Sequence, residues 1–366
     1  MNSTKSTRIE RFFTKLSVRF VYLIALFVFF EIFSGFALKL YYDFRHGSTD
    51  YSFAGDARKE LEKVQEDATL NVYRWYANKP NYSGKFVVTD QSGFRINNLN
   101  LDDRSQVGMF GGSTTFSILT DQDGTIANLL SKSLNDHQIL NFGVGGYSTS
   151  AEIMTLVEAI RSYPDMKTAV FYDGVNELGR AIGDYGTVNH SYQLLGYPYK
   201  FAVNAAIVKE SGNFLSWQFK HSNMFYIYDR IISKINLSRN FPIEKVLNEV
   251  VERYFLNLKV INGICAEHGI KCIYTWQPSV FNVQDGSLSD KEIEIKNSTP
   301  RSYYLLLTKL IFLDERSTDF NVINLASALD KKSKSQTVFQ DWSHLSADGN
   351  MYIANALRDV FIKLFY

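Results

Sequence analysis

The first long apolar run of the chain covers residues 20–38, which include a single charged side chain. A helix of that length can cross the hydrocarbon core of a bilayer. Residues 1–19 carry five basic residues and one acid, and this bias predicts a cytoplasmic basic tail. The pattern therefore predicts a single-pass transmembrane helix with everything after it outside the cytoplasm. A cleaved signal peptide is an alternative, because Gly35 and Ala37 offer small residues near a cleavage spacing.

The next part of the chain, residues 39–100, lacks the long periodic runs of a folded core. Residues 56–67 are charged and helix-prone, which predicts a short stalk. Residues 86–96 read as two short strands around a polar turn that contains Gly93, the pattern of a β-hairpin. We expect a stalk and hairpin connector here.

Short apolar runs and helix-periodic runs alternate from residue 101 to residue 366. The predicted strands are residues 106–111, 137–144, 167–173, 271–277 and 321–325. The predicted helices are residues 125–134, 150–162, 244–268, 300–313 and 346–364, with Ser346 as the N-cap of the last. Apolar strands separated by helices imply a mostly parallel sheet that is covered on both faces. The fold class we predict is α/β, a flavodoxin-like three-layer α/β/α sandwich around a five-stranded sheet.

One segment interrupts this alternation and is rich in aromatic side chains between glycines and asparagines. We interpret residues 179–243 as an inserted cap beside the site, with amphipathic runs that indicate a folded segment. Its large aromatic residues are Tyr185, Tyr192, Tyr197, Tyr199, Trp217, Phe225, Tyr226 and Tyr228.

The composition of the chain argues against several classes of function. The 366 residues are 45% hydrophobic and 21% charged, which is enough for a sizeable core. A formal net charge of +1 without a long basic run argues against a nucleic-acid partner. The two cysteines, Cys265 and Cys272, do not have zinc-site spacing, and we expect two buried thiols, with a disulfide as the alternative. No metal, nucleotide or flavin motif is found, so no cofactor is expected.

The candidate chemistry starts from Asp341 and His344, near the C-terminus. A carboxylate three residues before a histidine can hold one imidazole nitrogen while the other faces a nucleophile. Ser113 is a candidate nucleophile, because it follows an apolar strand in a Gly-Gly-Ser-Thr run. A serine hydroxyl is a weak nucleophile at neutral pH and needs such a base within hydrogen-bond distance.

Two further turns follow the second and third predicted strands, at residues 141–146 and 173–177. Parallel strands end at one edge of the sheet, so these turns and the Ser113 turn converge on one crevice. The Ser113 run is not a P-loop, because no Gly-Lys-Ser/Thr follows it. It is also not the Gly-x-Ser-x-Gly elbow of α/β-hydrolases.

Ser113, Gly146, Asn176 and His344, in that order, resemble the four sequence blocks of the SGNH (GDSL-type) hydrolase family. The resemblance implies a serine nucleophile at Ser113, a general base at His344 and an orienting carboxylate at Asp341. It also implies an oxyanion hole made by the backbone N–H groups of Ser113 and Gly146 and the side-chain amide of Asn176.

The chain departs from the family pattern at two positions. The usual aspartate before the serine is Gly112, and the aspartate after the asparagine is Glu177. Both departures look like the branch of membrane-anchored SGNH proteins associated with bacterial cell-envelope polysaccharides. A Gly-Phe-Arg element at residues 93–95 resembles the same branch.

These observations predict a serine esterase anchored in the bacterial cytoplasmic membrane through residues 20–38. The expected substrate is a short acyl ester, acetyl above all, on a cell-envelope carbohydrate, cleaved through an acyl-Ser113 intermediate. One alternative is an O-acyltransferase that uses the same triad and a membrane protein as acyl donor. Another is a catalytically silent carbohydrate-binding assembly protein on the same fold.

Overall fold

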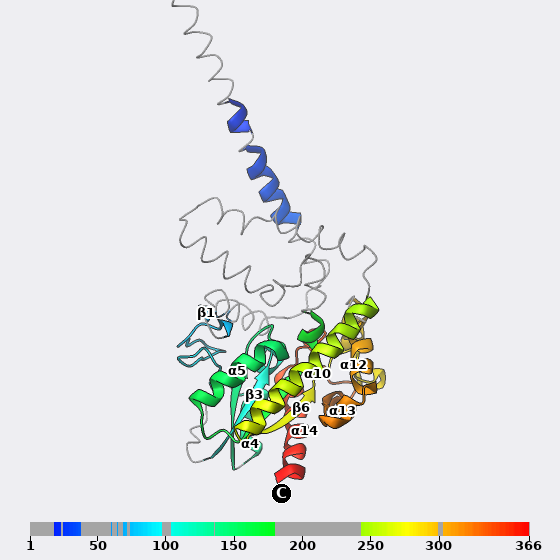
Figure 1. The fold of residues 1–366 in the computed structure, drawn as a ribbon. Coiled ribbons are helices and arrows are strands. Elements are labelled where there is room, and N and C mark those ends of the chain that lie inside the picture. The colour runs from blue at the N-terminus through cyan, green and yellow to red at the C-terminus, as the bar shows by residue number, and fades with distance from the viewer. Residues whose placement is uncertain are drawn as a thin grey trace, which may run out of the picture. The chain divides into compact units, whose positions relative to one another are not determined.

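The computed structural model of the chain describes residues 18–22, 25–37, 60, 64, 69–71, 74–96, 104–134, 136–179, 243–298 and 303–365 (Figure 1). Nearly all of the predicted basic tail, stalk and aromatic cap lies outside these residues, and the last two residues of the tail, 18 and 19, belong to the apolar helix. By its contacts, the chain divides into two compact units. One unit contains Met1–Asp50 and Asn204–Phe241, and the other contains Tyr51–Val203 and Pro242–Tyr366.

The described part of the first unit is the apolar helix Val18–Ala37, which is blue in Figure 1. It has 20 residues and a mean hydropathy of 2.2, and most of its described side chains are exposed. Its length and composition are those of a helix that crosses a membrane, and a signal sequence has the same properties.

The second unit is built on a five-stranded sheet in which every strand pairs with its neighbours in parallel. The strand order is β4-β3-β5-β6-β7, which is the flavodoxin-like order. The strands are β3 (Ser105–Gly111), β4 (His137–Gly143), β5 (Thr168–Asp173), β6 (Lys271–Trp276) and β7 (Ile323–Asn324). The predicted fold class is therefore confirmed. A separate antiparallel pair, β1 (Thr69–Asn71) and β2 (Trp75–Ala77), precedes the sheet.

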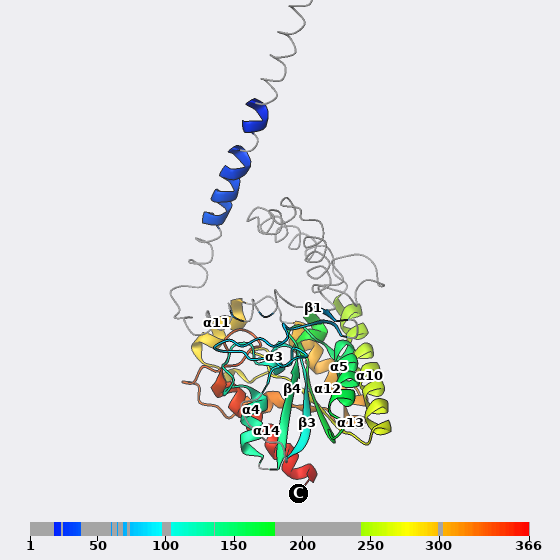
Figure 2. The same ribbon diagram turned by 90° about the vertical axis from the view of Figure 1, so that its left-hand side faces the viewer.

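Helices cover both faces of the sheet (Figures 1 and 2). Helices α4 (Ile126–Ser133) and α14 (Ala347–Phe365) pack together on one side. On the other side α10 (Ile243–Glu267) packs against α5 (Thr149–Ser162) and α12 (Tyr303–Leu313). The remaining described helices are α3 (Ser113–Phe116), α11 (Asp290–Ser298), α13 (Arg316–Asp319), η2 (Asp285–Ser287) and η3 (Leu325–Leu329). Ser346 caps α14, as predicted, since its hydroxyl accepts a hydrogen bond from the Gly349 N–H.

A row of aromatic rings crosses the middle of the sheet. Phe142, Phe110, Phe171 and Tyr274 occupy paired positions on four adjacent strands and are all buried. The successive ring centroids are 5.0, 5.0 and 5.7 Å apart in stacked arrangements. Such cross-strand pairs stabilise the sheet beyond their buried area, so these rings belong to the core.

The hairpin predicted for residues 86–96 is present as an antiparallel bridge between Thr89 and Arg95, and a second bridge extends the pairing back to Ser83; we call residues 82–96 the N-terminal hairpin. The second bridge joins Ser83 to Val88 and is also antiparallel. The turn requires Gly93, whose φ of +79° lies in the left-handed region. The hairpin packs on the edge of the sheet, because Arg95 also bridges to Asn141 of β4.

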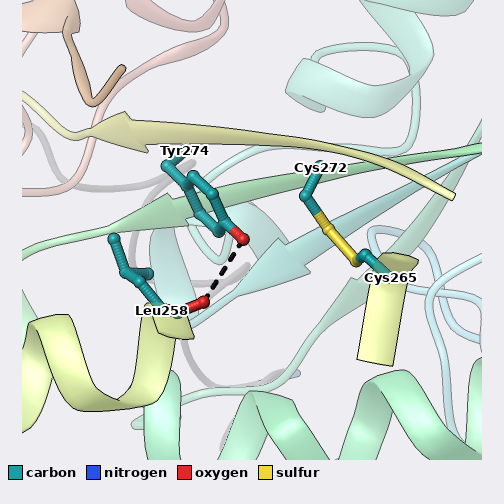
Figure 3. Close-up of a disulfide and its surroundings, with 4 residues drawn as sticks. All are labelled: Leu258, Cys265, Cys272 and Tyr274. Carbon is teal, nitrogen blue, oxygen red and sulfur yellow. Dashed lines mark hydrogen bonds between the residues drawn. A yellow bond between two sulfur atoms is a disulfide. The ribbon is translucent and has the colours of Figure 1, made fainter. Parts of the chain in front are cut away.

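The expectation of two free thiols is wrong, because Cys265 and Cys272 form a disulfide (Figure 3). Cys265 lies near the end of α10 and Cys272 near the start of β6. The chain reverses between them at Gly269, whose φ is +63°, and Ile270 N donates to Cys265 O. This reversal brings the two Cα atoms to 6.4 Å, which is within disulfide range.

Candidate active site

Ser113 is the first residue of α3, directly after the carboxyl end of β3. Because β3 lies between β4 and β5, this end is where the strand order reverses, the usual place for a ligand site in such sheets. Gly111 has a φ of +152°, and a side chain there would collide with the Thr115 side chain and the Tyr172 carbonyl. The close turn from β3 into α3 therefore requires glycine.

The three side chains expected to form a triad lie in a continuous hydrogen-bonded row. Ser113 Oγ is 2.7 Å from His344 Nε2, and His344 Nδ1 is 2.7 Å from Asp341 Oδ2. The second carboxylate oxygen of Asp341 accepts from the backbone N–H groups of Ser343 and His344, each at 2.8 Å. With the carboxylate on Nδ1, the proton of the neutral ring belongs there, and Nε2 is left to accept the Ser113 proton.

The environment of Asp341 keeps it ionised. Burial on its own would raise the pKa of Asp341, but the His344 ring and the two backbone N–H groups outweigh this effect. The pKa of Asp341 is therefore held below its usual range. A carboxylate that stays charged can orient the His344 ring and stabilise the imidazolium that forms when the ring takes a proton.

Asn176 lies against the nucleophile turn. A Cβ atom at Gly112 would stand 1.9 Å from Asn176 Nδ2, so the amide occupies the space over Gly112 beside Ser113. Asn176 Nδ2 also donates to Tyr147 O at 2.7 Å, which leaves its second hydrogen for another acceptor. In this structure a side chain at position 112 would displace the Asn176 amide.

Gly146 precedes Tyr147 in the second glycine turn and has a φ of +79°. The turn is closed by a hydrogen bond from Tyr147 N to Val144 O at 3.0 Å. The structure thus brings the Ser113 turn, the Gly146 turn and Asn176 to the same edge of the sheet. Backbone and amide N–H groups in such an arrangement can stabilise an oxyanion.

A small cavity touches both Ser113 and His344. Its volume is about 10 Å³, which is room for about one water molecule. The cavity is lined by Ser113, Thr114, Ser117, Ile118, Tyr172, His344, Leu345 and Asn350.

Sequence reasoning missed a buried ion pair that holds the loop of Asp341 and His344. Glu292 Oε1 accepts from the N–H groups of Val338 and Phe339, at 2.8 and 2.9 Å. Glu292 Oε2 is 2.7 Å from Lys332 Nζ, and both side chains are fully buried. Ser289 and Glu292 also form a reciprocal capping box at the start of α11. The Ser-x-x-Glu spacing in the sequence is the signal that could have identified Glu292.

Sequence reasoning also missed a group of buried carboxyls below the Asn176 turn. Glu152, Asp173 and Glu177 are exposed by 6% or less. Glu177 Oε1 accepts from Thr149 N at 2.7 Å. Burial, reinforced for Glu152 by the Asp173 carboxyl and for Asp173 by Glu177, raises the pKa of both Glu152 and Asp173 well above the usual range. These two carboxyls are therefore protonated well above the pH at which ordinary acids ionise.

Replacing Asp173 by asparagine is expected to stabilise the protein, and the gain should grow as the pH rises. The unfolded chain releases the Asp173 proton near pH 4, whereas the folded chain retains it to a higher pH. Folding then requires proton uptake, so the wild type loses roughly 1.4 kcal/mol per pH unit between those two values. The asparagine amide keeps a hydrogen-bond donor at this position and does not titrate, so the variant does not lose stability in this way as the pH rises.

The measurement is the Tm of wild type and Asp173→Asn at pH 4, 7 and 9, with Glu152→Gln as a second variant. The exposed Asp165→Asn is the control and should not change the pH dependence of Tm. A difference between wild type and Asp173→Asn that stays constant from pH 4 to 9 would contradict the raised pKa.

No established sequence family and no curated protein matches the chain. Several solved structures are similar to it. One is an acetyl xylan esterase, with 11% identity and a TM-score of 0.39, over 70% of this chain and 98% of that one. Another is the esterase EstA from Pseudoalteromonas sp., with 13% identity and a TM-score of 0.37, over 71% of this chain and 97% of that one.

A third is a member of the lipolytic protein G-D-S-L family from Veillonella parvula. It has 15% identity and a TM-score of 0.38, over 71% of this chain and 99% of that one. At these identities and TM-scores the likeness does not by itself assign an activity to this chain. The function is therefore inferred from the geometry of the site residues.

Proposed function

We propose that the protein is a serine esterase of the SGNH type that acts through an acyl-Ser113 intermediate. The observation that carries this proposal is the row Ser113–His344–Asp341, with both intervening distances at 2.7 Å. The four sequence blocks and the position of Asn176 against the nucleophile turn support it further.

The proposed reaction follows from these contacts. Ser113 Oγ attacks the ester carbonyl carbon while its proton passes to His344 Nε2. The tetrahedral intermediate then breaks the bond to the alcohol oxygen, which leaves with that proton. Water attacks the acyl-serine with the same base, so that a carboxylic acid is released and Ser113 recovers its proton.

The substrate we propose is an acetyl ester on a cell-envelope carbohydrate. The short acyl group rests on the resemblance to the polysaccharide-associated SGNH proteins. The apolar N-terminal helix supports membrane anchoring. The Cys265–Cys272 disulfide supports an active site outside the cytoplasm, where such bonds persist. The carbohydrate rests on the looser resemblance to the polysaccharide-associated branch.

The full-length protein is expected to hydrolyse p-nitrophenyl acetate at least about tenfold faster, in kcat/KM, than the octanoate ester. A tenfold change corresponds to about 1.4 kcal/mol in the transition state, which is the scale of one or two methylene groups that do not fit a pocket. A fluorophosphonate probe should also label Ser113, which peptide mass spectrometry can locate. Labelling elsewhere, or none, would count against the esterase; equal rates on both esters would count against the short acyl group.

In cells, the acyl groups on surface glycans can be measured by mass spectrometry with and without this protein. A hydrolase predicts that glycan acylation rises when the protein is absent. A fall would instead indicate acyl transfer to the glycan through the same serine. Unchanged acylation would contradict a glycan substrate.

A further inference from the structure

The guanidinium of Arg95, in the N-terminal hairpin, is buried against the nucleophile turn. The residue is 2% exposed. All three of its nitrogens donate hydrogen bonds at 2.5–2.9 Å, and the acceptors are Gln122 Oε1 and the backbone carbonyls of Phe86, Phe116, Ser117 and Thr120. Its charge also lies 5.2 Å from the centre of the Phe116 ring.

Two of these acceptors, the carbonyls of Phe116 and Ser117, lie at the C-terminal end of α3, the helix that begins at Ser113. Helix α3 has only one turn, so its last carbonyls have no partners within a longer helix. Thr115 O accepts from Asn141 Nδ2 at 3.0 Å, and Arg95 Nη1 donates to both Phe116 O and Ser117 O at 2.8 Å. The end of α3 is therefore fixed by residues outside the helix.

The residue after α3 is in a conformation that needs support. Ser117 has a φ of +59°, which is uncommon for a residue with a side chain and costs about 1 kcal/mol or more. Such a conformation persists where neighbours hold it in place. Arg95 binds its carbonyl, and the Ser117 hydroxyl contacts Thr114 O at 3.3 Å.

Burying a guanidinium costs free energy because the charge loses its hydration, and the hydrogen bonds of Arg95 must compensate for this loss. Within the described ranges, no carboxylate lies within ion-pair distance of Arg95, and carbonyl oxygens supply most of its hydrogen bonds. Burial lowers the pKa of Arg95 to about 9, which leaves the side chain charged at neutral pH. A positive charge at the carbonyl end of α3 is favourable, because the carbonyl dipoles point toward it.

We propose that Arg95 is a positioning residue that sets the location of Ser113 relative to His344 through the end of α3. This inference rests on the proposed function for its catalytic consequence. The segment that contains Arg95, residues 74–96, also contacts the second glycine turn. This segment therefore supports two of the turns that form the site. The Tyr76 hydroxyl donates to Gly145 O at 2.6 Å, and the Tyr147 hydroxyl donates to Arg74 O at 2.8 Å.

The test is Arg95→Lys in the full-length protein, with Arg104→Lys as the matched control. Arg104 Nη1 donates to Ser131 O and Leu134 O at the end of α4, which carries no site residue. We expect kcat on p-nitrophenyl acetate to fall roughly 10- to 100-fold in Arg95→Lys, since a small displacement of reacting groups has effects of that size. KM should change less than threefold, and Arg104→Lys should keep the wild-type kcat.

Hydrogen exchange of the amides of residues 113–120 provides a readout that does not require turnover. These amides should exchange faster in Arg95→Lys than in wild type or Arg104→Lys. If kcat per folded molecule and this local exchange both match the control, the proposal is overturned. If wild type lacks Ser113-dependent turnover, the proposed function fails, while the exchange result still decides whether Arg95 holds the turn.

If Arg95→Lys does not fold, Gln122→Met is the milder variant. It removes the side-chain acceptor of Arg95 Nε and leaves the four carbonyl acceptors in place. We expect it to lower kcat less than tenfold with the same local increase in exchange. Wild-type kcat and exchange in Gln122→Met would overturn the proposal.

Discussion

Replacing either Ser113 or His344 by alanine is expected to lower kcat on p-nitrophenyl acetate by about 10⁴- to 10⁶-fold. Ser113→Ala removes the atom that forms the acyl intermediate. His344→Ala removes the acceptor that lies 2.7 Å from that atom, so the hydroxyl cannot lose its proton during attack. Because the two groups act in one step, the double variant should be hardly slower than either single variant.

The measurement is steady-state hydrolysis by full-length protein purified in detergent, together with circular dichroism to confirm folding. Ser162→Ala and His268→Ala are matched controls, since both residues are exposed and lie away from the site. Both should retain wild-type kcat. Turnover in Ser113→Ala equal to that of wild type would show that hydrolysis does not use this serine.

Replacing Glu292 by alanine is expected to reduce the free energy of unfolding by about 3–5 kcal/mol. The change leaves the Lys332 ammonium buried without its carboxylate and removes the acceptor for Val338 N and Phe339 N. These two N–H groups begin the loop of Asp341 and His344, so kcat should fall as well. Urea denaturation and ester hydrolysis measure the two effects.

The exposed Glu294→Ala, from the same helix, is the control and should change stability by less than about 0.5 kcal/mol. Glu292→Gln combined with Lys332→Met should recover part of the stability, because no charge is then buried and the amide oxygen can still accept from Val338 N and Phe339 N. A loss below about 1 kcal/mol in Glu292→Ala would mean that the pair does not hold the loop.

The pH dependence gives a further check on Glu292. Burial raises its pKa, but Lys332 and three backbone N–H groups outweigh this effect and leave the pKa below its ordinary value. Since the folded-state pKa is lower than the unfolded one, the stabilisation is present above about pH 4 and is lost as the pH falls further. The stability difference between wild type and Glu292→Ala should therefore shrink in acid.

The sheet could be predicted from the sequence because its strands are buried on both faces. Runs such as residues 107–110 and 169–172 are continuous and apolar, and helical runs separate the strands. Parallel strands end at one edge, so the positions of Ser113 and Asn176 after two such strands were enough to predict that they meet. The spacing of Asp341 and His344 likewise predicted their hydrogen bond.

The supporting contacts could not be predicted, since each joins residues that are distant in the sequence. Lys332 lies 40 residues from Glu292, and Arg95 lies 21 residues from its Phe116 acceptor. A buried lysine or arginine looks like a surface residue in a hydropathy pattern. The disulfide was missed for a different reason: its formation depends on Cα separation across the Gly269 reversal, which spacing alone does not give.

The nucleophile and its base are 231 positions apart along the polypeptide. At typical translation speeds of about 5–20 residues per second, the ribosome needs roughly 10 to 50 seconds to progress from one to the other. During that interval the nascent chain has Ser113 but not the His344 imidazole that is proposed to activate it. Under the proposed mechanism, a chain that terminates before residue 344 therefore has the nucleophile without its base, and we expect it to be inactive toward esters.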